Sequence, residues 1–85
     1  MNGYTLSRHA EHMLEERGIK LDWLDFAMQD PSIVEPDPVD SELEHRLRRI
    51  PEFGNRILRV VVKHGDPPLV VTAFFDRSRR NDPRL

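Results

Sequence analysis

The chain has 85 residues, which is enough for one small domain and too few for two. Charged residues make up 33% and hydrophobic residues 38%, as is normal for a globular protein, and the lack of cysteine excludes disulfides, zinc–thiolate centres and thiol nucleophiles. No apolar run approaches the roughly 20 residues of a membrane span. The N-terminus also lacks the pattern of a signal peptide, so we expect a cytoplasmic protein without membrane association.

The net charge of −2 conceals an uneven distribution along the chain. Residues 1–44 carry three basic and eleven acidic side chains, whereas residues 45–85 carry ten basic and four acidic ones. A basic half is typical of proteins that attract polyanions. The alternative is that the two halves neutralise each other across the fold.

Two helices are predicted in the first third of the chain. Ser7 is a suitable N-cap because its hydroxyl can accept a hydrogen bond from an orphan backbone N–H. Apolar side chains then follow a helical spacing up to Gly18, which is expected to end the helix in a left-handed conformation. A second helix is predicted from Leu21 to Gln29, where the following Asp-Pro pair stops it because the residue before proline avoids the α region.

The remainder of the chain has the pattern of strands. A short strand is predicted at "SIVEP" (32–36), followed by the exposed, acidic loop "PDPVDSE" and an alternating stretch at 43–50. The two strongest strands, "RILRVVVKHG" and "PLVVTAFFDR", are β-branched and aromatic, and "HGDPP" joins them as a hairpin.

These elements predict an α+β domain. We expect two N-terminal helices packed on one face of an antiparallel meander sheet of three to four strands. Residues 1–77 form this single domain, and residues 78–85 form a basic, flexible tail. A core this thin would also be compatible with a homodimer.

Metals and nucleotide cofactors are not expected. His9 and His12 are three residues apart on one helix, a spacing that can present two imidazoles together, but no HExxH motif is present. The four glycines form no phosphate-binding loop.

The remaining candidates suit metal-free cleavage of a phosphodiester, which needs a general base, a cation at the phosphate oxygens and a proton donor. His9 lies at the edge of the first helix's apolar stripe and can serve as base or acid near neutral pH. Arg17 lies within that stripe and can pair with phosphate through two hydrogen bonds. Arg59 and Thr72 lie in the two long strands and can hold a phosphate. Each residue also has a structural alternative. His9 would bond a backbone carbonyl, and Arg17 would lay its stem along apolar surface and pair with an acid. Thr72 would be present for packing within its strand alone.

Further basic side chains could hold an RNA backbone: Arg46, Arg48, Lys63 and Arg77. The alternative is that they form solvated faces. Aromatic residues are few and mostly at core-like positions, so base stacking on the face of the sheet is not expected.

The motifs "YTLSRHAEHMLEERGI", "LRVVV" and "VVTAFFDR" resemble a small bacterial family called domain of unknown function four-two-five-eight. The resemblance extends from Tyr4 to about Arg77. The family is similar to the barnase–EndoU–colicin–RelE-like fold, which includes many metal-independent ribonuclease toxins. By this resemblance His9 and Arg17 match motif positions in the helix, and Arg59 and Thr72 match polar positions in the strand pair.

The resemblance implies a metal-independent endoribonuclease of toxin type, with RNA as substrate and a cognate antitoxin or immunity protein as partner. The alternative is a non-catalytic, nuclease-like module that binds a protein or RNA. The chain departs from the family in its acidic loop at 35–44, which would repel RNA if it lay beside the site.

Overall fold

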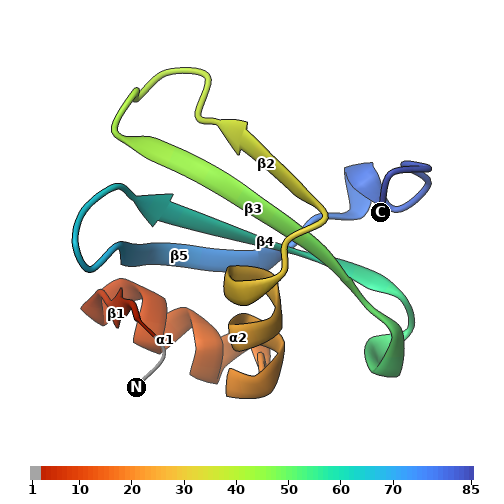
Figure 1. Cartoon of the computed structure of the whole chain (residues 1–85). Helices are drawn as coiled ribbons and strands as arrows, with labels where there is room; N and C mark the ends of the chain where they lie inside the picture. Colours follow the sequence, from red (N-terminus) through yellow and green to blue (C-terminus); the bar gives the residue numbers. More distant parts are fainter. Residues whose placement is uncertain (1–2) are drawn as a thin grey trace.

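A computed structural model describes residues 3–85, so the first two residues of the predicted domain lie outside the described part. This part has two α-helices and five β-strands (Figure 1). The elements in chain order are β1 (Thr5–Leu6), α1 (Arg8–Arg17), α2 (Leu21–Gln29), β2 (Ile33–Pro36), β3 (Leu43–Ile50), the 3₁₀ turn η1 (Pro51–Phe53), β4 (Arg56–Lys63), β5 (Leu69–Phe75) and the 3₁₀ turn η2 (Arg77–Arg79).

The strands form one mixed sheet in the order β1-β5-β4-β3-β2. β2 to β5 make an antiparallel meander, and β1 adds a strand parallel to β5 through the pairs Thr5↔Leu69 and Leu6↔Val70. The α+β class and the two helices are therefore confirmed. The predicted antiparallel meander is present as β2 to β5, but the sheet has a fifth, parallel strand that was not predicted. A two-residue strand is too short to show alternation in the sequence.

The ends of α1 follow from two residues singled out in the sequence. The Ser7 hydroxyl accepts a hydrogen bond from the Ala10 backbone N–H at 3.0 Å and donates one to the Val71 carbonyl at 2.9 Å, which also fixes the helix to β5. Gly18 has a φ of 62°, a left-handed conformation that costs little without a side chain. The Ile19 N–H then bonds the Leu14 carbonyl at 2.9 Å, and the predicted cap is confirmed.

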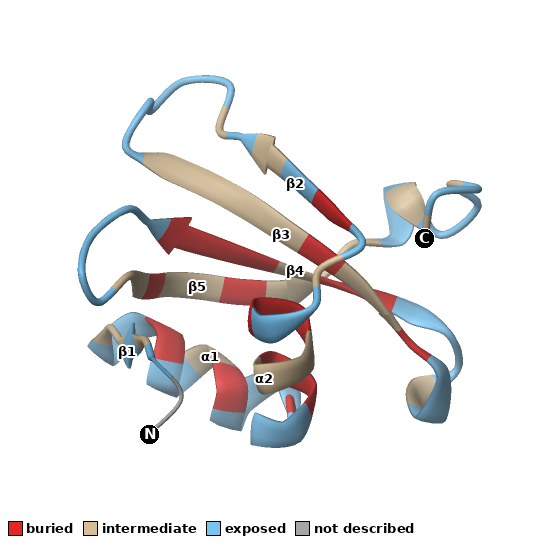
Figure 2. Ribbon diagram, in the orientation of Figure 1, coloured by how far each residue is buried: buried red, intermediate tan, exposed pale blue. Residues whose placement is uncertain are grey.

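Both helices cover the same face of the sheet (Figure 1). Figure 2 shows that the buried positions concentrate along β4 and on the inward sides of the helices. None of the helices in residues 3–85 is long and apolar enough to cross a membrane. The main core contains Ala10, Leu14, Ile19, Trp23, Leu24, Ala27, Met28, Ile50, Leu58, Val60, Val62, Val70 and Ala73.

The other face of the sheet carries no helix, and we call it the open face. A second, smaller apolar cluster lies there, formed by Ile33, Leu47 and Ile57 with Leu85 packed against it. Residues 77–85, which include the predicted tail, thus return to the sheet in this structure. β4 lies in the middle of the sheet and contributes to both clusters, so it is the strand on which the two faces depend.

Leu24→Ala should lower the free energy of unfolding by about 2–5 kcal/mol, because it leaves a cavity in the main core. Urea denaturation followed by circular dichroism measures this change. Leu21→Ala is the matched control on the same helix: Leu21 is 61% exposed, and its loss should change stability by no more than about 0.5 kcal/mol. Equal losses in the two variants would contradict the assigned orientation of α2.

Candidate functional site

The sheet separates the four residues predicted to be catalytic. His9 and Arg17 lie exposed on α1, on the helical side. Leu58 and Val60 face the helices, so Arg59, between them on β4, faces the open side. Thr72 pairs with Val61 and shares that open side. The four side chains therefore do not form the single cluster that the catalytic hypothesis requires.

His9 and Arg17 do not meet on the helix either. They belong to one row of side chains with Met13 between them, and the Arg17 Nε–H bonds the Met13 sulfur at 3.3 Å. Eight residues of helix separate them by about 12 Å along the axis. Within residues 3–85, Arg17 forms no ion pair with an acid, so the expected partner of a snorkelling arginine is not found there.

Two of the arginines predicted to hold RNA contact α2 and the turn after it. Arg46 donates to the Met28 carbonyl at 2.9 Å and to Glu44 at 2.6 Å. Arg48 donates to the Ser32 hydroxyl at 2.6 Å, and its guanidinium lies 4.1 Å from the centre of the Phe26 ring. These contacts hold the end of α2 against β3.

The other two predicted RNA-holding residues lie at opposite ends of the sheet. Lys63, at the end of β4, is half-exposed and 3.9 Å from a Glu42 carboxylate oxygen. Arg77, in η2, is exposed and lines a pocket. Only Arg77 of the predicted RNA-holding set therefore contributes to that pocket.

Arg59 forms the centre of an ionic network on the open face. Its side chain is only 13% exposed, and its guanidinium nitrogens lie 2.8 and 2.6 Å from one Asp76 oxygen and 3.8 Å from Glu35. It also lies 2.7 Å from His45 Nδ1. Burial raises the pKa of Asp76, but hydrogen bonds from Ser78 and Arg59 outweigh this effect and hold the pKa below its ordinary value.

The network extends from His45 to the loop between β2 and β3. A guanidinium can only donate, so His45 Nδ1 accepts from Arg59 and its Nε2–H donates to Asp37 at 2.6 Å. Hydrogen bonds from the Asp40 backbone N–H, from His45 and from the Val39 N–H lower the pKa of Asp37 to about 2. Both ring nitrogens of His45 are engaged, which leaves neither free to accept a proton from a substrate.

A second set of contacts holds the chain after β5. Arg79 donates to the two Glu35 oxygens at 2.8 and 3.2 Å, a two-pronged pairing, and also contacts Asp82 at 3.1 Å. Arg49, on β3, donates to the carbonyls of Arg80 at 2.8 Å and Leu85 at 3.1 Å. These contacts fix residues 79–85 beside β2 and β3.

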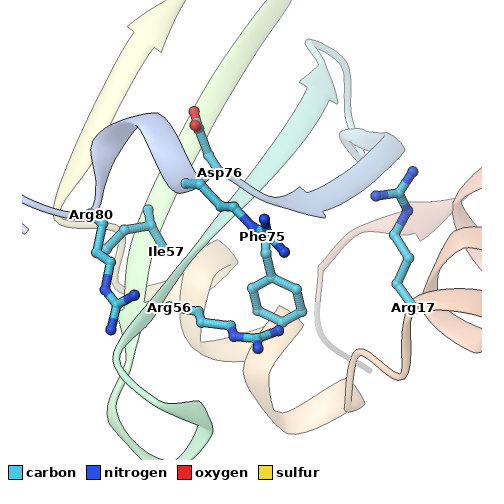
Figure 3. A pocket seen from close by; sticks show the side chains of 7 residues that line it. Arg17, Arg56, Ile57, Phe75, Asp76 and Arg80 are labelled. Carbon is cyan, nitrogen blue, oxygen red and sulfur yellow. The ribbon is translucent and has the colours of Figure 1, made fainter.

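An open pocket of about 650 Å³ lies where β5 ends and β4 begins. Figure 3 shows Arg17 on one side of the Phe75 ring and Arg80 on the other, with the Asp76 carboxylate pointing away from Arg56 and Arg80. The residues that line the pocket are Arg17, Arg56, Ile57, Phe75, Asp76, Arg77 and Arg80. We call it the arginine pocket.

The arginine pocket has an excess of positive charge. Its lining holds four arginines and one acid, and that acid, Asp76, already binds Arg59 and Ser78. Within residues 3–85, none of the four arginines forms an ion pair with a carboxylate, although Arg56 lies over the Phe53 ring at 4.6 Å. Four unpaired guanidinium groups around one hollow can bind an anion.

The chemistry available at the arginine pocket is binding rather than proton transfer. No histidine belongs to its lining within the described chain, and the lowered pKa keeps Asp76 ionised and a weak base. In residues 3–85 no three His, Cys, Asp or Glu side chains are grouped so that they could hold a metal ion.

Sequence reasoning missed Arg56, Phe75 and Arg80 as site residues. The basic run at 77–80 was the available signal, but alone it also fits a solvated surface. What brings these side chains together is the return of the chain after β5, which local periodicity does not encode.

Arg59→Met should lower the free energy of unfolding by about 2–3 kcal/mol, because it leaves Asp76 and His45 without their cationic partner. This loss is smaller than the one expected for a fully buried ion pair. Urea denaturation at neutral pH measures the loss. The control is Arg84→Met, whose pair with Asp82 involves a 63% exposed arginine side chain and should contribute about 0–1 kcal/mol. Similar effects of the two substitutions would contradict a central role for Arg59.

Stability should fall as the pH is lowered from about 4 towards 2. The pKa of Asp37 is about 2 in the folded chain and near 3.8 without its partners, so the unfolded chain binds the proton more readily in this range. The stabilisation is therefore complete above the unfolded value and lost as the pH falls through the folded one. Urea midpoints measured across this range should fall less steeply for Asp37→Asn, and an unchanged slope would contradict the assignment.

Comparison with known proteins identifies the family but not the activity. Neither the curated proteins nor the solved structures contain a match. The sequence profile of one family, described as a domain of unknown function (DUF4258), matches residues 6–75, which is most of the chain. The protein therefore belongs to the DUF4258 family.

Proposed function

We propose that this domain is a nuclease-like binding module that holds the phosphate backbone of RNA in the arginine pocket without cleaving it. The observation that carries the proposal is the group of four arginines without carboxylate partners in the described chain. A guanidinium matches the geometry of a phosphate and stays charged at every physiological pH. RNA is the polyanion implied by the resemblance to the barnase–EndoU–colicin–RelE-like fold.

The contrast with the open face supports the choice of this pocket. Arg59 and Arg79 both form ion pairs with acidic side chains of the protein, so a phosphate would have to displace those acids to reach them. At the arginine pocket a phosphate displaces only water and counterions. Release of those counterions is the main source of favourable free energy in non-specific RNA binding.

The acidic loop does not oppose this assignment. It joins β2 to β3, and Leu43 at its end pairs with Lys63, the last residue of β4. Arg56, in the pocket lining, is the first residue of the same strand. Seven residues of extended chain span about 23 Å, so the loop lies beyond the far end of the sheet from the pocket (Figure 1).

Catalysis would need a proton acceptor that the pocket lining does not supply. His9, the predicted base, lies two helical turns before Arg17, which is the point where α1 meets the pocket. Binding without cleavage is therefore the better match to the geometry than the endoribonuclease hypothesis.

Substitution of Arg17, Arg77 and Arg80 by Gln should weaken binding of a labelled single-stranded RNA and reduce its salt dependence. Each lost phosphate contact lowers the slope of log affinity against log salt by about 0.7, so the triple variant should lose about 2. Fluorescence anisotropy at several salt concentrations measures the slope. Lys63→Gln, which removes a charge at the far end of β4, is the control and should change the slope little.

Three outcomes would overturn the proposal. The wild-type protein could fail to bind RNA at low salt, or Lys63→Gln could reduce the slope as much as a pocket substitution. Cleavage of RNA by wild-type protein in EDTA, lost in His9→Ala, would instead support the metal-independent endoribonuclease hypothesis.

A further inference from the structure

We infer that the arginine pocket takes a single strand, with the Phe75 ring as the surface on which one base stacks. This inference rests on the proposed function and specifies the form of nucleic acid. Phe75 is the aromatic member of the pocket lining, and Figure 3 shows its ring between Arg17 and Arg80. A flat apolar ring flanked by cations matches the two parts of a nucleotide, its base and its phosphate.

The Phe75 ring is held in place from behind. Its centre lies 5.1 Å from that of Phe53 and 6.2 Å from that of Trp23, and these two rings stack on each other at 4.9 Å. Trp23 is buried in the main core, so the group of three rings is anchored there. A ring that is already fixed loses little conformational entropy when a base stacks on it.

Phe75 is only partly buried, unlike the core residues on the same strand. Val70 and Ala73 are fully covered, whereas Phe75 retains accessible surface and lines the pocket. The neighbouring Phe53 ring already carries a flat group, since the Arg56 guanidinium lies over it at 4.6 Å. Stacking of planar groups is thus a feature of this end of the sheet.

The geometry favours a single strand over a duplex. In a duplex both faces of each internal base are covered by its neighbours, so a protein ring cannot reach them without unstacking the helix. A pocket of about 650 Å³ lies within the range of sites for small ligands, and it offers one ring rather than an extended face. An unpaired base can enter such a pocket while the adjacent phosphates contact the arginines.

Three probes of equal length test the inference on the wild-type protein by competition anisotropy: a single-stranded RNA, the same strand without bases, and the RNA duplex. We expect the base-bearing single strand to bind about 10-fold more tightly than the abasic strand, which is within the range for stacking of one base on an aromatic side chain. The duplex should bind no more tightly than the abasic strand does.

Substitution at Phe75 supplies the second measurement. Phe75→Leu should lower affinity for the base-bearing strand by about 10-fold and leave the abasic strand unaffected, and Phe75→Tyr should restore the preference. Thermal unfolding checks that both variants are folded. If Phe75→Leu does not fold, the comparison of the three probes on the wild-type protein still tests the inference.

The outcomes separate this inference from the proposed function. Equal affinity of the wild-type protein for the base-bearing and abasic strands overturns stacking but leaves phosphate binding in place. Tighter binding of the duplex than of the single strand also overturns it. If none of the probes binds, the proposed function itself is wrong.

Discussion

The guanidinium of Arg59 places a positive charge in the middle of the open face of β4, and much of that face is arranged around it. A charge with a side chain only 13% exposed is costly unless it is paired and hydrogen-bonded. Asp76 and His45 supply these partners from the strand end beyond β5 and from β3. The pairing fixes the position at which the chain leaves the sheet. The position of the C-terminal segment therefore depends on an electrostatic requirement as well as on apolar packing.

That C-terminal segment connects the network to the arginine pocket. Arg79 points to Glu35 on the open face, whereas Arg77 and Arg80 on the same short segment line the pocket. The arginines of this segment thus have different roles: Arg79 is paired within the protein, whereas Arg77 and Arg80 are available to an anion. A displaced segment would remove two of the four pocket arginines, so the ionic network holds in place part of the lining of the proposed binding site.

Pairing across the fold also explains the uneven charge of the sequence. Acids of the first half pair with cations of the second, as in Glu35 with Arg79 and Asp30 with Arg48. The two halves therefore neutralise each other over much of the sheet. The excess of positive charge remains at the end of the sheet where Arg56, Arg77 and Arg80 gather, and it is this local excess that supports the proposed function.

The sequence by itself determined both helices with their boundaries, the four meander strands and the caps at Ser7 and Gly18, because these features depend on residues close together in the chain. It did not determine β1, whose two residues are defined as a strand by their pairing with β5. The sequence also did not determine which face of the sheet Arg59 occupies. The run "RILRVVVK" has apolar residues at both alternating sets of positions, because β4 is buried on both faces. Only the tertiary structure decided which cations are paired and which meet at the arginine pocket, since this depends on strand order, register and the return of the chain after β5, all of which are contacts between residues far apart in sequence.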